Sequence, residues 1–167
     1  MGTITVLDQS MRAVEEETQA SNLLDQVRRA EKKTFPRDEA MDFDMELKKR
    51  NTELVIVLIA QDSCEDNDHS LAGYLVYARL HGIALLHKVC VLEGHQRQGI
   101  ARSMLSRLKD RLQGQGCERL QLWVDEARKP ARALYESSGF KISDRARDYY
   151  GPGRTGIKMV IDLNSVW

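Results

Sequence analysis

The sequence predicts an α/β fold in which helices flank a mixed sheet. The run 53–60 (ELVIVLIA) is dense in β-branched residues, which is typical of a strand buried on both faces. Two further apolar runs, 71–80 and 83–92, are separated by a His-Gly pair that suits a hairpin turn. The segment 100–113, which follows them, carries apolar residues at helical spacing. Strand and helix patterns that alternate in this way indicate an α/β protein.

The first part of the chain predicts one short strand and two helices before the strand at 53–60. Residues 4–7 form the strand, and residues 14–34 the first helix, which opens with three glutamates. Pro36 lacks an N–H and disfavours helix at Phe35, so the first helix ends there. A second helix is expected over 38–50. Its inward-facing residues are expected to be Met41, Met45 and Leu47.

The remainder of the chain alternates between the two patterns. The helix at 100–113 is closed by glycines and followed by a strand at 118–124. A short helix at 129–138 precedes strands at 140–147 and 156–163, which a Gly-Pro-Gly turn separates. The helix at 100–113 is expected to bury Met104, Leu105, Leu108 and Leu112. The predicted order is β-α-α-β-β-β-α-β-α-β-β, about seven strands and four helices in one domain covering residues 1–167.

Composition excludes several classes of function. Lys and Arg (25) balance Asp and Glu (25), so the chain has no overall basic field for nucleic acid or an anionic membrane. No apolar run is long enough for a membrane span, and the N-terminus lacks the layout of a signal peptide. The three cysteines are widely spaced and match no metal site, and the acidic segment 61–70 is interpreted as a solvated loop. We therefore expect reduced thiols, no bound metal and a cytoplasmic or nuclear location.

The loop between the strand at 83–92 and the next helix has the features of a phosphate site. Its sequence, Gln96 to Ala101, places Gly99 just before the helix begins. Backbone N–H groups at a helix N-terminus and the positive end of its dipole bind phosphate. Gly99 permits a positive φ, and Arg97 and Arg102 supply charge-assisted contacts.

Two motifs resemble the GNAT superfamily of N-acetyltransferases. The segment 89–105 (VCVLEGHQRQGIARSML) is similar to that family's acetyl-CoA motif, and 131–140 (A-x-x-L-Y-x-x-x-G-F) is similar to its second signature. The resemblance implies acetyl-CoA as cosubstrate and a sheet that splays between its fourth and fifth strands. It places the pantetheine arm along Val89, Cys90 and Val91. It places the pyrophosphate on Gln96, Arg97, Gln98, Gly99, Ile100, Ala101 and Arg102.

The same resemblance assigns catalytic roles. The N–H of Val91 is expected to bind the thioester carbonyl, and Tyr135 to protonate the leaving thiolate. Arg128 stands where the family often has Asn and is expected to contact the cosubstrate's phosphates or a nearby carbonyl. His87 matches a histidine of arylalkylamine N-acetyltransferases and is a candidate base. Trp123 stands where protein N-terminal acetyltransferases often have His or Glu.

Other side chains near these positions admit plainer interpretations. Asp125 and Glu126 follow a strand and are either alternative bases or solvated loop carboxylates. Cys90 is interpreted as a small buried residue and not as a nucleophile, because no base adjoins it in the sequence.

The acceptor is indicated by a third resemblance. Residues 147–150 (RDYY) with 156–159 (GIKM) are similar to a hairpin of RimI-like protein Nα-acetyltransferases, in which a Tyr pair brackets the substrate. Tyr149 and Tyr150 are thus expected on one side of the acceptor groove and Phe35-Pro36 on the other; alternatively, the tyrosines only shape a turn. The resemblance implies an acyltransferase for a peptide or protein α-amine.

Two other functions stay open. One is acetylation of a small aryl- or alkylamine or a polyamine, and the other is an acetyl-CoA-binding regulatory module without activity. The sequence leaves both a monomer and a homodimer open.

Overall fold

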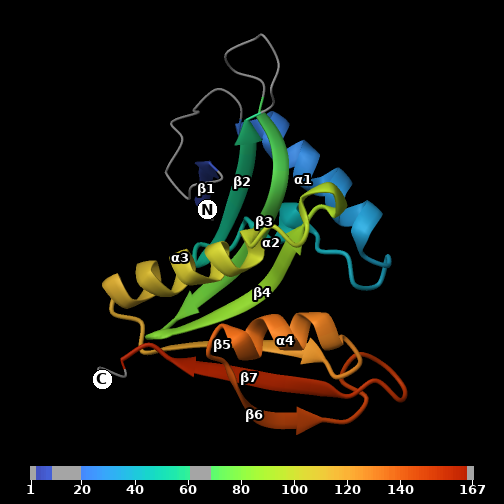
Figure 1. Ribbon diagram of the computed structural model, residues 1–167, viewed down its shortest axis with the longest axis vertical. Helices are drawn as coiled ribbons and strands as arrows, with labels where there is room; N and C mark the ends of the chain where they lie inside the picture. The colour runs from blue at the N-terminus through green and yellow to red at the C-terminus, as the bar shows by residue number, and fades with distance from the viewer. Residues whose placement is uncertain (1–2, 9–19, 61–68, 165–167) are drawn as a thin grey trace. The chain divides into compact units, whose positions relative to one another are not determined.

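The computed structural model describes residues 3–8, 20–60 and 69–164 and shows one mixed sheet in the strand order β1-β2-β3-β4-β5-β7-β6 (Figure 1). The predicted α/β class, seven strands and four helices are confirmed. No helix within these described ranges has the length and apolar character to span a membrane. The elements are β1 (Thr3–Asp8), α1 (Ala20–Thr34), α2 (Phe43–Glu46), β2 (Thr52–Ala60), β3 (His69–Leu80), β4 (Ile83–Val91), the 3-10 helix η1 (Glu93–His95), α3 (Ile100–Gly114), β5 (Arg119–Asp125), α4 (Lys129–Ser137), β6 (Lys141–Ala146) and β7 (Gly156–Asp162).

The chain divides into two compact units. The first comprises the described residues up to Val76 together with Lys88–Ile100. The second comprises Tyr77–His87 and the described residues from Ala101 onward. The strands β3 and β4 each contribute residues to both units.

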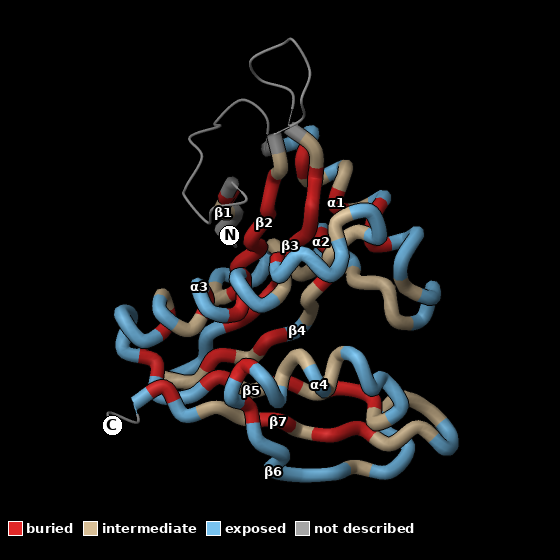
Figure 2. Tube along the Cα trace, in the orientation of Figure 1, coloured by how far each residue is buried: buried red, intermediate tan, exposed pale blue. Residues whose placement is uncertain are grey.

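The first unit is built around β2 and α1. β1 pairs with β2 in parallel, from Thr3↔Glu53 to Asp8↔Leu58. Each residue of β2 from Thr52 to Leu58 is buried, as predicted for a strand covered on both faces (Figure 2). The apolar face of α1 packs against β2 in the hydrophobic core of this unit. The core also contains Phe43, whose ring meets Tyr74 edge-on at 5.9 Å between centroids. Residues from α1 in the core are Leu23, Val27 and Ala30.

The second unit contains the other end of the sheet. β5 and β7 pair antiparallel from Arg119↔Asp162 to Asp125↔Gly156, and β6 continues the sheet beyond β7. β4 and β5 pair in parallel, but their register stops at Leu86↔Leu122 and does not include the end of β4. A sheet that splays at this point, as the family resemblance implies, requires such an early stop. The buried stripe predicted for α3 is confirmed at Met104, Leu105, Leu108 and Leu112.

The hairpin turn between β3 and β4 was predicted from its His-Gly pair and is confirmed. His81 and Gly82 have φ values of 46° and 81°, and two successive positive φ values are the mark of a type I′ turn. Such a turn matches the right-handed twist of the strands that it joins.

The second helix predicted over 38–50 is wrong in its extent. α2 contains only Phe43–Glu46. Its start is set by Asp42, which adopts an extended conformation and caps the N–H groups of Asp44 and Met45. Met45, which was expected to face inward, is 57% exposed. The predicted start of the first helix, residues 14–19, lies outside the described residues, as does most of the predicted loop 61–70.

Candidate active site

A pocket of about 740 Å³ opens in the first unit where β4 ends. Val91 lines it together with the chain that follows as far as Gln96, and the last turn of α1 forms its other side. The side-chain amide of Gln96 donates to the carbonyl of Val91 at 3.1 Å, so two residues predicted to bind acetyl-CoA meet here. The N–H of Leu92 donates to the carbonyl of Ala72 at 2.9 Å and anchors the end of β4 to β3.

The loop that follows is exposed and has an unusual backbone. Residues 96–99 are all exposed, and both Arg97 and Gly99 have positive φ, 61° and 79°. A Cβ on Gly99 would meet nothing within 4 Å, so the backbone angle and not lack of space demands glycine. α3 begins at Ile100, and its first turn contains no acidic residue that would offset the dipole. The first N–H groups of a helix have no partner within it, so this loop can receive a phosphate.

The strand residues predicted to face the pantetheine arm differ in burial. Val89 and Val91 are partly exposed, whereas Cys90 is 4% exposed. Burial raises the pKa of the Cys90 thiol above its ordinary value, with the side chains of Tyr74 and Thr34 acting in the opposite direction. A buried thiol with a raised pKa is a poor nucleophile, in agreement with its interpretation as a packing residue. His87, two residues before Val89 on β4, is exposed and belongs to the second unit.

Tyr135 lies in the second unit on α4, where its ring meets Phe140 edge-on at 5.7 Å between centroids. Burial raises the pKa of Tyr135 to about 12, and the cation of Arg128 acts in the opposite direction. The phenol is therefore protonated at neutral pH. Arg128 itself is exposed at the residue that precedes α4. Arg102 of α3 donates to the Ser137 hydroxyl at 3.2 Å, which ties α3 to α4.

The predicted tyrosine pair belongs to an aromatic cluster in the second unit. The ring of Tyr149 stacks on Trp123, with centroids 4.4 Å apart and planes within 14°. Tyr150 meets Tyr149 edge-on at 4.9 Å. Tyr149 is still 48% exposed, so one face of the cluster is open to solvent. A Cβ on Gly156 would lie 2.7 Å from the Cβ and Cγ of Tyr149, which shows why glycine occupies the first position of β7.

The carboxylates considered as bases are already engaged. Asp125 accepts from the N–H of Ala127 at 2.9 Å and from Nε of Arg154 at 2.8 Å. The Ala127 N–H and the Arg154 cation lower the pKa of Asp125, against the effect of burial. Glu126 forms an ion pair with Arg145. A carboxylate with a lowered pKa is a weak proton acceptor at neutral pH, so Asp125 is better suited to holding the turn before β7.

Phe35 and Pro36 begin a segment of the first unit that buried charges hold in place. Lys88 lies 3.6 Å from the centroid of the Phe35 ring, pairs with Glu31 at 2.7 Å and donates to the carbonyl of Glu39 at 2.9 Å. Glu31 is 1% exposed and also accepts from the hydroxyl of Tyr74 and, at 2.8 Å, from the N–H of Met41. We call Glu31, Lys88 and Tyr74 the buried charge network. It joins α1, β3 and β4 to both ends of the segment 35–41.

Comparison with known proteins identifies the family. Residues 21–140 match the Acetyltransferase (GNAT) family. The chain belongs to the GNAT family of acetyltransferases.

Its GNAT relatives include ribosomal protein bS18-alanine N-acetyltransferases. The protein from Escherichia coli K12 is 40% identical over 67 residues, which are 40% of this chain and 45% of that protein. The one from Salmonella typhimurium is 34% identical over 83 residues, 50% of this chain and 56% of that protein. The chain thus spans about half the length of the curated relatives it matches. These relatives confirm the predicted similarity to the RimI-like subclass.

Solved structures of GNAT proteins share the fold. The ribosomal-protein-S18-alanine N-acetyltransferase from Escherichia coli superposes with a TM-score of 0.67, covering 92% of this chain and 97% of that one at 21% identity. NAA60 from Arabidopsis thaliana, solved with a bisubstrate analogue, gives a TM-score of 0.70 over 87% of this chain and 95% of that one at 18% identity. At such identities the likeness concerns the fold.

The residues of the GNAT signature fit acetyl-CoA chemically. The exposed loop before α3 offers backbone donors and Arg97 to phosphates, and the pocket at the end of β4 is large enough for part of a flexible chain. The sequence analysis did not find the buried charge network. The signal that could have found it is Glu31, four residues after Val27 on the buried face of α1, because a buried carboxylate requires a partner.

Proposed function

We propose that this GNAT protein transfers the acetyl group of acetyl-CoA to a free α-amine of a peptide or protein, by direct attack in a ternary complex. The pocket at the end of β4 is the observation that carries the proposal, because it joins Val91 and Gln96 immediately before the Gly99 loop. The choice of an α-amine is supported by relatives named as alanine N-acetyltransferases of ribosomal protein bS18.

Acetyl-CoA supplies the activated acyl group. We assign its phosphates to the loop from Gln96 to Arg102, with further charge from Arg128, and its pantetheine arm to the exposed backbone of Val89, Cys90 and Val91. The N–H of Val91 donates to the carbonyl oxygen of the thioester, where negative charge develops during attack. A backbone donor on a strand is preorganised, because it needs no side-chain reorientation.

Tyr135 acts as the general acid in this proposal. Its pKa of about 12 keeps the hydroxyl protonated at neutral pH, so that Oη carries a proton for the departing sulfur. Its edge-on contact with Phe140 restricts the position of the ring.

The proton of the incoming amine needs an acceptor. Because Asp125 and Glu126 are engaged with arginines, we assign that role to the exposed His87, acting directly or through water. The acceptor peptide is assigned to Phe35 and Pro36 in the first unit and to Tyr149 and Tyr150 in the second. The hydroxyl groups of the two tyrosines can hydrogen-bond a peptide backbone without selecting a side chain.

A panel of amines tests this function through the release of free coenzyme A thiol from acetyl-CoA. It contains short peptides with free α-amines, the same peptides blocked at the N-terminus but carrying lysine, and small aryl-, alkyl- and polyamines. We expect turnover with free α-amines alone. Turnover with small amines only would move the function to a small-molecule acetyltransferase. Binding of acetyl-CoA without transfer to any amine would favour a regulatory module.

A further inference from the structure

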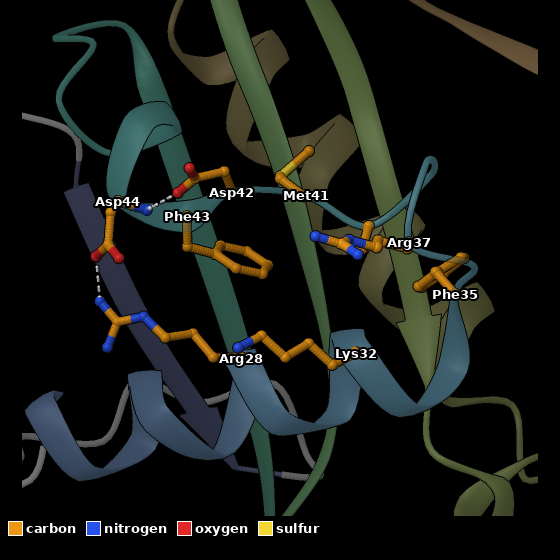
Figure 3. Close-up of a pocket in the computed structure, with 9 residues that line it drawn as sticks. Arg28, Lys32, Phe35, Arg37, Met41, Asp42, Phe43 and Asp44 are labelled. Atoms are coloured by element: carbon orange, nitrogen blue, oxygen red, sulfur yellow. Dashed lines mark hydrogen bonds and ion pairs between the residues drawn. The ribbon is translucent and has the colours of Figure 1, made fainter.

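A second pocket, of about 600 Å³, lies in the first unit between α1 and the segment that leads to α2 (Figure 3). Arg28 extends from α1 to Asp44 of that segment, Lys32 lies along α1 beside Arg28, and Arg37 reaches toward the same space from the segment itself. The apolar part of the lining is formed by Phe35, Met41 and Phe43. We call this the cationic pocket.

The acidic residues that line the cationic pocket already have hydrogen-bond or ion-pair partners. Asp42 caps α2 by accepting from the N–H groups of Asp44 and Met45 at 3.0 and 3.2 Å. Asp44 forms an ion pair with Arg28, which also pairs with Asp25 at 2.6 Å. Neither carboxylate therefore neutralises the other two cations of the lining.

Among the described residues, two cations of the cationic pocket remain without an anionic partner. Within the part of the chain that the structure describes, the side chains of Lys32 and Arg37 form no hydrogen bond or ion pair, and Nε of Arg28 is buried without a hydrogen-bond partner. Two cations that have no partner in the described ranges thus lie beside an apolar lining. This combination suits a carboxylate that is carried on an aliphatic chain, since the methylene groups pack on Phe43 and Met41 while the charge meets the cations.

The cationic pocket is held in shape by the buried charge network. The N–H of Met41 donates to Glu31 at 2.8 Å, and the ring of Phe43 is fixed against Tyr74. The lining segment is therefore anchored on both sides of Asp42, and an incoming group does not have to order it. Preorganisation of this kind lowers the entropic cost of binding.

We propose that the cationic pocket binds an acidic side chain of the peptide acceptor, a few residues after its free α-amine. The inference rests on the proposed function and adds the substrate's sequence preference to it. Phe35 connects the two, because it lines the cationic pocket and begins the segment assigned to the acceptor. An Asp or Glu at this site gains charge-assisted hydrogen bonds from Lys32 and Arg37.

Matched peptides test this preference. Each pair shares a free α-amine and differs only by Asp or Asn, or Glu or Gln, at the second, third or fourth position; kcat/KM is measured for both members at low ionic strength. For the wild-type protein we expect one position at which the acidic peptide is favoured by about tenfold, the size of one charge-assisted hydrogen bond. Added salt should reduce the ratio, because Lys32 and Arg37 are exposed.

Variants distinguish binding of the acidic side chain in the cationic pocket from long-range electrostatic attraction. In Lys32→Met, Arg37→Met and the double variant, the ratio of acidic to neutral peptide should fall toward one. Arg29→Met removes the same charge from the same helix at an exposed residue outside the cationic pocket, and should retain the wild-type ratio. A similar loss in Arg29→Met would contradict the assignment, because long-range attraction would then explain the preference.

The outcomes also distinguish this inference from the proposed function. If neutral and acidic peptides are acetylated equally by the wild-type protein, the inference is overturned while the function stands. If inorganic phosphate binds to the cationic pocket but no acidic peptide is preferred, the site binds a free anion and the inference is again overturned. If no peptide is acetylated, the proposed function fails and the inference fails with it.

Discussion

The two segments assigned to the acceptor peptide are held in place by different interactions. In the first unit, the segment 35–41 is fixed by the buried charge network, in which Glu31 is 1% and Lys88 is 11% exposed. In the second unit, the turn before β7 is fixed by the stack of Tyr149 on Trp123 and by the pairing of Asp125 with Arg154. Tyr149 remains 48% exposed.

This difference determines how each segment should respond to mutation. Removing one partner of a buried ion pair is strongly destabilising, because the other charge is left buried without compensation. A half-exposed aromatic stack contributes about 0.5–1.5 kcal/mol beyond its buried area, and its loss can be relieved by movement of the turn. We therefore expect a single substitution to destabilise the first segment more strongly than the second.

The largest effect is expected for Lys88→Met. It leaves the Glu31 carboxylate buried and deprived of its cation, which should lower the free energy of unfolding by about 3 kcal/mol. Urea unfolding measures the loss, and KM for the peptide should rise more than kcat falls because the segment 35–41 is released. The control is Lys48→Met, which removes an exposed lysine of the same unit.

The double variant Glu31→Gln/Lys88→Met makes that comparison stricter. Replacing both charges removes the uncompensated carboxylate, so much of the lost stability should return. The network does not hold the segment if Lys88→Met is no more destabilising than Lys48→Met. The same follows if the double variant loses as much stability as the single variants Glu31→Gln and Lys88→Met lose together.

Gly156→Ala should have an intermediate effect in the second unit. The added Cβ would lie 2.7 Å from Tyr149, so the ring must leave Trp123 or the turn must shift, at a cost of about 1–3 kcal/mol. The fluorescence of Trp123 should change with it. Gly114→Ala serves as the control, since a Cβ there meets nothing within 4 Å. Unchanged fluorescence and stability in Gly156→Ala would remove the steric argument for the stack.

The smallest effect is expected for Asp125→Asn, and it depends on pH. The folded protein lowers the pKa of Asp125, so the stability from this carboxylate is present above its unfolded pKa of about 3.9 and is lost as pH falls through the folded value. At neutral pH the variant should lose about 1–2 kcal/mol. Unfolding measured from pH 7 to pH 3 should show the wild type and the variant converging, whereas Asp110→Asn, on an exposed part of α3, should leave the profile unchanged.

Sequence periodicity predicted the regular elements well, for reasons that the structure makes visible. β2 is apolar because both of its faces are covered, and α3 carries its apolar residues on the single face that it buries. α2 was overestimated because the spacing of Met41 and Met45 resembles a helix, although the cap at Asp42 delays the start of the helix to Phe43. A cap competes with periodicity through a local hydrogen bond that apolar spacing does not record.

The candidate site was predicted unevenly. The Gly99 loop has a local backbone requirement that its sequence reveals, and the positive φ of Gly99 agrees with it. The partners of Glu31, by contrast, come from β3, β4 and the segment 35–41, so only the fold brings them together. The same is true of Trp123 and Tyr149, which are distant in sequence and meet through the pairing of β5 with β7.

The function as a whole is tested most directly by mapping where the acetyl group goes. One peptide that carries both a free α-amine and a lysine is incubated with acetyl-CoA, and its products are sequenced by mass spectrometry for the wild type and for Tyr135→Phe. We expect a single acetyl group on the α-amine, formed about a hundredfold more slowly by Tyr135→Phe because the leaving thiolate loses its proton donor. Acetylation of the lysine, or an unchanged rate in Tyr135→Phe, would contradict the acceptor or the acid that we assign.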